Sequence, residues 1–220
     1  MTQDVAGQYL HAEWCGQLYA EIFCKGGIQK IFSVLSYKTT ICTWSKHASS
    51  GTFPVNRFDA DHRFTAQDIC DLHTLWLSPI YSWAGVYRSV DIGKGGFQFA
   101  RARLIPNLMA TLERDTLKKH TPCRPADDAT LAFALAEVHA ELILVHPFRE
   151  GNGRLARLLT LMMALQAGLP PLDFNPMLGR GRRSYIGGIH VAMGRDYGPL
   201  AAVFKKIIAR SKQRAAANTR

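Results

Sequence analysis

Two helical stretches joined by a very short loop constrain the fold of this chain more than any other sequence feature. The first, residues 127–146, carries an apolar stripe at helical spacing, formed by Leu131, Leu135, Val138, Leu142 and Val145. Pro147 is expected to end that helix. A second helix resumes near Gly153 and runs to about Gln166, where the Pro170-Pro171 pair ends it. We therefore expect a mainly α-helical domain.

Weaker patterns add further helices and one β-hairpin. Thr65 and Asp68 can cap a helix over residues 66–77, and helical spacing also occurs over 5–23, 102–118, 182–194 and 197–212. Residues 86–92 alternate in polarity like a strand, residues 93–96 form a glycine-rich turn, and residues 97–99 form a short return strand. The predicted fold class is mainly α, a helical bundle with one β-hairpin.

Residues 26–57 do not share the helical pattern. Residues 31–37 and 39–44 are rich in β-branched and aromatic side chains, which favours extended structure, and residues 49–54 are typical of a loop. No function follows from this segment.

The composition is that of a soluble globular protein in a reducing compartment. The 220 residues are 47% hydrophobic, and no apolar run approaches the ~18 residues of a membrane span. The N-terminus has no basic region followed by an apolar core, so no secretory signal is predicted. Five cysteines, none in a Cys-x-x-Cys pair, argue against a disulfide framework and a zinc site. We expect a cytoplasmic protein, or one delivered into a host cell.

The net charge of +10 is unevenly spread, because residues 205–220 hold six cations and no acid. A second stretch without acids spans residues 24–58. A basic segment can be a footprint for nucleic acid or another anionic surface. It can also be the solvated end of a helix, where the dipole favours cations. We favour the helix for residues 205–220 and expect no nucleic-acid partner.

The loop between the two strongest helices gathers the groups that phosphate chemistry needs. Residues 146–157 read His-Pro-Phe-Arg-Glu-Gly-Asn-Gly-Arg-Leu-Ala-Arg. The free N–H groups and the dipole at the start of the second helix can bind an anion. Gly151 and Gly153 let the backbone approach that anion, and Arg154 and Arg157 share one helix face and can clamp outer phosphates.

Two further residues of this loop supply acid–base and metal chemistry. Glu150 can bind Mg²⁺ together with phosphate oxygens. His146 has a side-chain pKa suited to removing a proton from an attacking hydroxyl. Each feature alone is more often structural, because helix-end histidines, Gly-Asn-Gly turns and paired arginines are common. Their occurrence together within twelve residues predicts a nucleotidyl- or phosphoryl-transfer site.

This run resembles the signature of the Fic family, HPFx(D/E)GNGRxxR, at every specified position. The resemblance extends over roughly residues 59–200, including Trp83-Ala84-Gly85 and Lys94-Gly95-Gly96-Phe97, but not over residues 26–57. It implies a Fic fold. It also implies transfer of AMP from Mg²⁺-bound ATP to a Ser, Thr or Tyr hydroxyl of a target protein, with release of pyrophosphate.

The resemblance divides the chain into three parts. Residues 1–58 would form an N-terminal helix and an atypical basic segment packed on the core. Residues 59–204 would form the Fic catalytic core, and residues 205–220 a basic C-terminal tail.

The resemblance also implies roles for the first half of the signature. His146 is the general base, Phe148 anchors the loop in the core, and Glu150 coordinates Mg²⁺. The backbone of Gly151-Asn152-Gly153 forms the anion hole, with the Asn152 side chain assisting at the phosphates.

The resemblance also implies roles for the two arginines of the signature. Arg154 is expected to contact the outer phosphates of ATP. Arg157 plays a similar role and is also the usual partner of an inhibitory glutamate in the family.

The hairpin resembles the flap on which Fic enzymes dock their targets. A target segment can add to the edge of the flap as a strand, which positions its hydroxyl through main-chain hydrogen bonds. The flap residues are Lys94, Gly95, Gly96 and Phe97, and Phe97 is either a clamp on the modified side chain or ordinary hairpin packing. Tyr185 lies in a helix that often walls the nucleotide pocket, where it either contacts the base or packs in the core.

One departure from many family members concerns inhibition. None of the six glutamates has Ser or Thr four residues before it and Gly or Asn after it, which is the pattern of the family's inhibitory helix. The chain is therefore expected to be unrestrained or restrained by a small antitoxin subunit, as in bacterial toxin–antitoxin pairs. A non-standard regulator within the atypical N-terminal segment is a third alternative.

Other functions remain as alternatives. A kinase-like relative usually has Lys where Gly153 stands, which argues against γ-phosphate transfer. Another nucleotide or phosphocholine could be the donor, because the signature recognises phosphates better than bases. A nucleic-acid-binding module and a catalytically idle scaffold are the alternatives from other classes.

Overall fold

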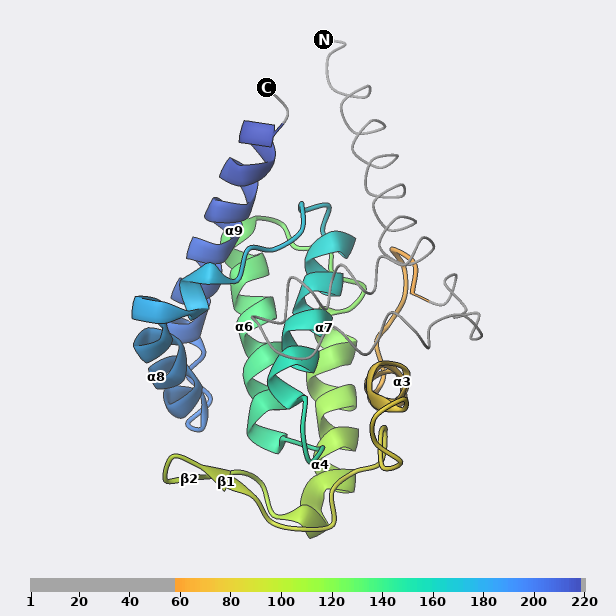
Figure 1. The fold of residues 1–220 in the computed structure, drawn as a ribbon. Coiled ribbons are helices and arrows are strands. Elements are labelled where there is room, and N and C mark those ends of the chain that lie inside the picture. The colour runs from red at the N-terminus through yellow and green to blue at the C-terminus, as the bar shows by residue number, and fades with distance from the viewer. Residues whose placement is uncertain (1–57, 219–220) are drawn as a thin grey trace. The chain divides into compact units, whose positions relative to one another are not determined.

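The computed structural model of the chain describes residues 58–218 (Figure 1). The chain separates into two compact units, Met1–Ala60 and Asp61–Arg220. The helix predicted over residues 5–23 and the extended segments predicted within residues 26–57 lie outside the described residues. The second unit carries the loop of residues 146–157.

The second unit is built around α6 (Asp128–Val145), which is buried on nearly all sides. Asp127 caps this helix by accepting a hydrogen bond from the Thr130 N–H at 2.7 Å. The whole predicted apolar stripe is buried, and so are alanines on the other faces, such as Ala134 and Ala140. Small side chains on these faces allow neighbouring helices to approach α6 closely.

Several of the described helices pack around this centre. α7 (Asn152–Gln166) and α9 (Gly198–Asn218) lie against α6, and α8 (Arg182–Ala192) packs against both α6 and α9 (Figure 1). α3 (Ala66–Leu77) packs against α7. The predicted fold class, mainly α with one β-hairpin, is confirmed.

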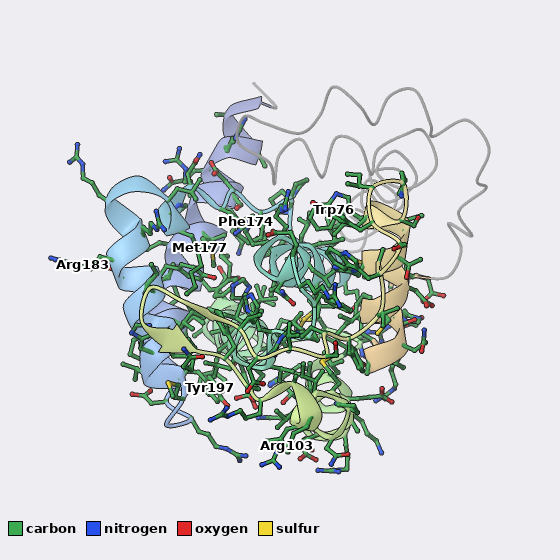
Figure 2. The ribbon with its side chains drawn as sticks, turned by 60° about the horizontal axis from the view of Figure 1, so that its bottom comes forward. Trp76, Arg103, Phe174, Met177, Arg183 and Tyr197 are labelled. Atoms are coloured by element: carbon green, nitrogen blue, oxygen red, sulfur yellow. The ribbon has the colours of Figure 1, made fainter. Side chains whose placement is uncertain are left out.

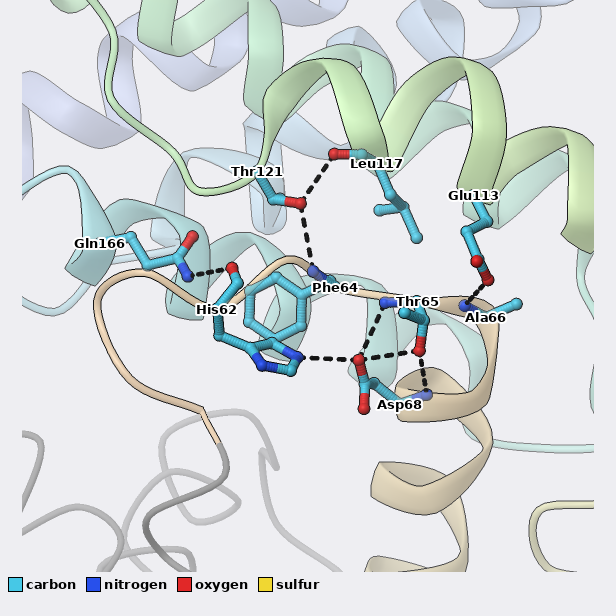
Figure 3. Close-up of polar contacts among 9 residues, drawn as sticks. All are labelled: His62, Phe64, Thr65, Ala66, Asp68, Glu113, Leu117, Thr121 and Gln166. Carbon is cyan, nitrogen blue, oxygen red and sulfur yellow. Dashed lines mark hydrogen bonds and ion pairs between the residues drawn. The ribbon is translucent and has the colours of Figure 1, made fainter.

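α3 has the predicted bounds, and it begins where it does because its first turn is capped as the sequence indicates (Figure 3). Thr65 Oγ1 accepts a hydrogen bond from the Asp68 N–H at 3.1 Å, and Asp68 Oδ2 accepts one from the Thr65 N–H at 2.9 Å. His62 Nε2 also lies 2.8 Å from Asp68 Oδ2. Burial alone would raise the pKa of Asp68, but its bonds to His62 and Thr65 lower the pKa overall.

The helix predicted over residues 102–118 is a continuous helical run of four parts. These are η3 (Ala102–Leu104), α4 (Ile105–Thr111), the π-helical turn η4 (Leu112–Leu117) and α5 (Lys118–His120). In the π-helical turn Glu113 accepts a hydrogen bond from the Ala66 N–H at 2.7 Å (Figure 3). This contact joins the run to the start of α3.

The hairpin is shorter than predicted. β1 (Gly93–Lys94) pairs antiparallel with β2 (Phe97–Gln98), and the turn is Gly95-Gly96, where φ is 59° and 81°. Residues 86–92 are not a strand, so that prediction was wrong. The reason is Arg88, whose side chain is buried and bonds to main-chain carbonyls, including Val90 O at 2.6 Å.

The C-terminal part begins where α7 ends, at Gln166 as predicted. The chain leaves α7 at Gly168, where φ is 76°, and continues through η5 (Asn175–Met177) and η6 (Gly179–Gly181) to α8. The basic residues 205–218 continue α9, so the predicted boundary at residue 205 falls within a helix. Within residues 58–218 no helix is long and apolar enough to cross a membrane.

Candidate active site

His146 follows directly after α6 in a left-handed conformation, with φ 51° and ψ 60°. Its N–H donates to Leu142 O at 3.0 Å, and its ring Nδ1 lies 3.0 Å from Ile143 O. A carbonyl oxygen can only accept, so Nδ1 carries the proton in this contact. The lone pair of the neutral ring is therefore on Nε2, the nitrogen that a general base uses.

Burial keeps the His146 ring neutral. Burial lowers the pKa of His146, the positive charges of Arg88 and Lys94 act in the same direction, and the bond to Ile143 and the Glu150 charge act in the opposite direction; together they leave the pKa at about 4. The ring also stacks on Phe99, with centroids 3.7 Å apart. At pH 7 the histidine is ready to accept a proton.

The loop after His146 is held from inside. Phe148 is fully buried and stacks on His73 of α3, with ring centroids 3.8 Å apart. The side chain of Asn152 accepts a hydrogen bond from the Phe148 N–H at 2.9 Å and donates one to Phe148 O at 2.8 Å. Phe148 is thus the expected anchor. The Asn152 side chain holds the loop through these two bonds, and its backbone N–H remains available to an anion.

The two glycines of the signature are required for different reasons. Gly151 is the N-cap of α7 with φ 84°, and a Cβ atom there would lie 2.7 Å from the Trp76 ring. A Cβ atom on Gly153 would meet only Arg157 Nη1, at 4.0 Å. Gly151 is therefore needed by the fold, whereas Gly153 leaves open space beside the N-terminus of α7.

Glu150 and Arg154 form the exposed rim of this space. Glu150 Oε1 accepts hydrogen bonds from the Gly151 N–H at 2.9 Å and from Arg154 Nη2 at 3.1 Å. Burial alone would raise the pKa of Glu150, but these two partners lower it overall. The Arg154 guanidinium lies 4.4 Å from the ring centroid of Trp76, which Figure 2 labels on α3. Glu150 is therefore a charged carboxylate on a braced loop.

Arg157 is largely buried, and no carboxylate among residues 58–217 lies within ion-pair distance of it. Burial accordingly lowers its pKa. Tyr185 lies near Arg157, but a hydrogen bond of 3.0 Å joins its hydroxyl to Nε2 of the buried His139. Among the described side chains Arg157 is thus a cation without an anion, and the Tyr185 hydroxyl is already engaged inside the bundle.

His139 and Glu141 do not form a metal pair. His139 is buried, whereas Glu141 accepts a hydrogen bond from the Tyr197 hydroxyl at 2.6 Å. Residues 58–217 contain no group of three or more potential metal-ligating side chains.

A series of ring contacts connects the hairpin to His146. Phe97 stacks nearly parallel on His190 of α8, with centroids 5.0 Å apart, and packs edge-on against Phe99 at 5.2 Å. Phe99 in turn stacks on His146. Of the four residues 94–97, Phe97 is therefore connected to His146 through Phe99. Gly95 and Gly96 form the exposed tip of the hairpin.

Two residues that tie this site together were missed in the sequence. His73 Nε2 donates to Glu150 O at 3.0 Å, and the Gly85 N–H donates to His73 Nδ1 at 2.8 Å. Arg88 donates from Nε to His146 O at 2.8 Å. Arg88 had a detectable signal, because it is the one charged residue on the apolar side of the alternating segment 86–92. His73 had none beyond its place in an apolar helix.

Comparison with known proteins places this site in a family. A model of the Fic/DOC family matches residues 63–164. Over 142 residues the chain is 31% identical to "Probable protein adenylyltransferase y4lH" of Sinorhizobium fredii, covering 62% of this chain and 69% of that protein. The chain belongs to the Fic/DOC family.

The Fic/DOC match spans α3 to α7, and so includes the hairpin and residues 146–157 but not Tyr185. "Protein adenylyltransferase fic-1" of Caenorhabditis briggsae is 30% identical over 160 residues, which are 70% of this chain. They are 29% of that protein, so the chain spans less than a third of its length. The N-terminal FIC domain of Bep8 from Bartonella sp. 1-1C shares the fold, with a TM-score of 0.60 at 18% identity over 70% of this chain and 77% of that one.

Proposed function

We propose that this chain is a protein adenylyltransferase, which transfers AMP from ATP to a Ser, Thr or Tyr hydroxyl of a target protein. Its relatives in Sinorhizobium fredii and Caenorhabditis briggsae carry that name. The observation that carries the proposal is the neutral His146, with Nε2 free to accept a proton, beside the N-terminus of α7. We assign the activity to the predicted core, residues 59–204, in the cytoplasm or in a host cell.

His146 acts as the general base. Its Nδ1–H stays on Ile143 O while Nε2 removes the proton of the target hydroxyl. The hydroxyl oxygen then bonds to the α-phosphorus of ATP, and the bond from that phosphorus to the oxygen bridging to the β-phosphate breaks. Pyrophosphate leaves with the electron pair, and the imidazolium of His146 returns its proton to water.

The start of α7 binds the phosphates. The N–H groups of Asn152 and Gly153 lie in the first turn, where a helix offers no internal partner. The open space beside Gly153 accommodates an anion. Arg154 and Arg157 supply positive charge on one side, and Arg157 has no competing carboxylate among residues 58–217.

Glu150 fits a magnesium ligand. Its side chain is 58% exposed and its pKa is lowered, so the carboxylate is charged and accessible. Mg²⁺ usually binds one or two carboxylates together with phosphate oxygens, and it neutralises charge on a transferred phosphoryl group. Glu150 would hold the ion on the loop between the base and the anion-binding helix.

The hairpin positions the target. Its short strands leave an edge where an extended target segment can pair, as other sheet edges do. Phe97 would then hold the modified side chain near Phe99 and His146. A contact of Tyr185 with the adenine base would use its ring, because its hydroxyl is bonded to His139.

We further propose that a small antitoxin subunit restrains the enzyme. The supporting observation is the largely buried Arg157, which lacks a carboxylate among the described residues. A glutamate of the antitoxin would pair with this guanidinium and block the outer phosphate. Arg157→Ala should then release a co-purified inhibitor, and an inhibitor that stays bound to the variant contradicts this part.

Label transfer tests the function. The purified chain and its His146→Ala variant are incubated with bacterial lysate, Mg²⁺ and ATP labelled at the α or the γ phosphate. We expect α label on protein, dependent on His146. Protein-bound γ label alone would establish a kinase instead, and labelling that persists in His146→Ala would remove the histidine from the mechanism.

A further inference from the structure

Arg88 is a buried cation that no carboxylate contacts within residues 58–217. Its side chain is 2% exposed, and all of its hydrogen bonds go to main-chain carbonyls. The nearby Asp91 is engaged elsewhere, because it accepts hydrogen bonds from Arg101 Nη1 at 2.8 Å and the Ala102 N–H at 2.7 Å. Burying a charge without a counter-charge costs free energy, so the burial of Arg88 needs a structural or functional reason.

The carbonyls that Arg88 contacts belong to three segments. Nε donates to His146 O at 2.8 Å, and Nη2 approaches Val145 O at 3.4 Å, both at the C-terminal end of α6. Nη1 donates to Val90 O at 2.6 Å, before β1, and Nη2 donates to Ala100 O at 2.5 Å, after β2. One guanidinium therefore joins the end of α6 to both ends of the hairpin.

The end of α6 needs this support. Carbonyls in the last turn of a helix lack internal partners, and the helix dipole places negative charge there, so a cation is favourable. His146 also has a φ of 51°, which residues other than glycine rarely adopt unless the surrounding structure holds them there. The Arg88 N–H adds a bond to Pro147 O at 2.9 Å, on the far side of the histidine.

We propose that Arg88 is a positioning residue for the transfer reaction, which holds the backbone of His146 and both ends of the target-docking hairpin in a fixed relative position. The base and the docked hydroxyl then meet because the same side chain fixes both. The inference rests on the proposed function, since the hairpin needs a fixed position relative to His146 only if a target docks on it.

The charge of Arg88 gives a second, independent readout. The groups whose charges act on His146 are Arg88, Lys94 of β1 and Glu150 of the loop, and the first two lower its pKa. Removing the Arg88 charge should therefore raise the pKa of His146. A general base must be neutral, so the acid limb of the pH–rate profile should move to higher pH.

A pair of substitutions separates the two effects. Arg88→Lys keeps the charge but replaces the planar fork by a single ammonium, which cannot reach all three segments. Arg88→Gln removes the charge as well. Arg103, an exposed arginine that Figure 2 shows at the surface, provides the matched control Arg103→Gln.

We would measure α-label transfer by the full-length variants under single turnover, from about pH 4 to 8, with binding of an ATP analogue measured separately. Arg88→Lys should lower the rate of transfer by as much as about a hundredfold, the scale of a misplacement of about 1 Å, while analogue binding stays near that of the wild type. Arg88→Gln should lose at least as much rate and shift the acid limb upward. Arg103→Gln should match the wild type.

Titration of the histidine ring by NMR supplies a readout that needs no target and no activity. The His146 signal is assigned by its loss in His146→Ala. A raised His146 pKa in folded Arg88→Gln supports the inference, and an unchanged one contradicts it. Arg88→Lys with the rate of the wild type would overturn the positioning role, as would losses that merely follow the folded fraction measured by circular dichroism.

These outcomes are separable from failure of the proposed function. A wild-type chain without His146-dependent α-label transfer would overturn adenylylation. The NMR titration would then still test, by itself, whether Arg88 controls the environment of His146.

Discussion

Replacing Asn152 with alanine should destabilise the protein, because this side chain holds the signature loop rather than a phosphate. Its amide meets both the N–H and the carbonyl of Phe148, at 2.9 and 2.8 Å, and both residues are buried. Alanine removes both partners at once, and each buried group left unpaired costs about 1–3 kcal/mol. Since water can enter and relieve part of this cost, the free energy of unfolding should fall by about 2–4 kcal/mol.

Urea unfolding of the full chain, followed by circular dichroism, measures this loss. Gly153→Ala is the matched control one residue along, because its Cβ meets only Arg157 Nη1 at 4.0 Å. It should leave the free energy of unfolding within about 0.5 kcal/mol of the wild type, or raise it slightly. Asn152→Asp keeps an acceptor for the Phe148 N–H, but it places a buried carboxylate against Phe148 O, so it should cost at least as much as alanine.

The opposite pattern would refute the reasoning. If Asn152→Ala unfolded like the wild type but bound ATP more weakly, the side chain would serve the phosphates, as the family resemblance implied. The loop would then be held by its other contacts, such as the stacking of Phe148 on His73 and the bond from His73 to Glu150 O.

Three further predictions follow from the same site. Gly151→Ala should lower the free energy of unfolding by about 2–4 kcal/mol in urea titrations, because φ is 84° and the added Cβ would lie 2.7 Å from the Trp76 ring. Stability should fall as the pH drops below about 6.5, because His146 and His139, with pKa values lowered to about 4 and about 3, stay neutral when folded but become charged when unfolded. His139→Phe should make unfolding less pH-dependent between about pH 5 and 7, and an unchanged slope would contradict this assignment. Arg157→Leu should raise the free energy of unfolding, because it removes a largely buried charge that has no anionic partner among residues 58–217, yet it should weaken ATP binding in calorimetry. A loss of stability would show that the guanidinium is satisfied.

Local chemistry predicted the regular elements well. The start of α3 follows from Thr65 and Asp68, which satisfy one another within a single turn. α6 follows from its apolar spacing and from Pro147 after it. The alternation of residues 86–92 led to a wrong prediction of a strand, because an extended segment outside a sheet can have the same pattern. The two differ in the hydrogen-bond partners of the backbone. Val90 O accepts from the Arg88 side chain instead of from a neighbouring strand.

The sequence by itself determined the helix–loop–helix and the residue types of the signature, since capping, periodicity and glycine turns act between neighbours. Only the tertiary structure decided how those residues are used. The Tyr185 hydroxyl is taken by His139, 46 positions away, and Glu150 O is held by His73, 77 positions away. Such contacts arise because an unpaired polar group is costly when buried, so most buried polar groups bond to whatever partner the packed chain presents. The spacing of residues along the chain does not encode that choice.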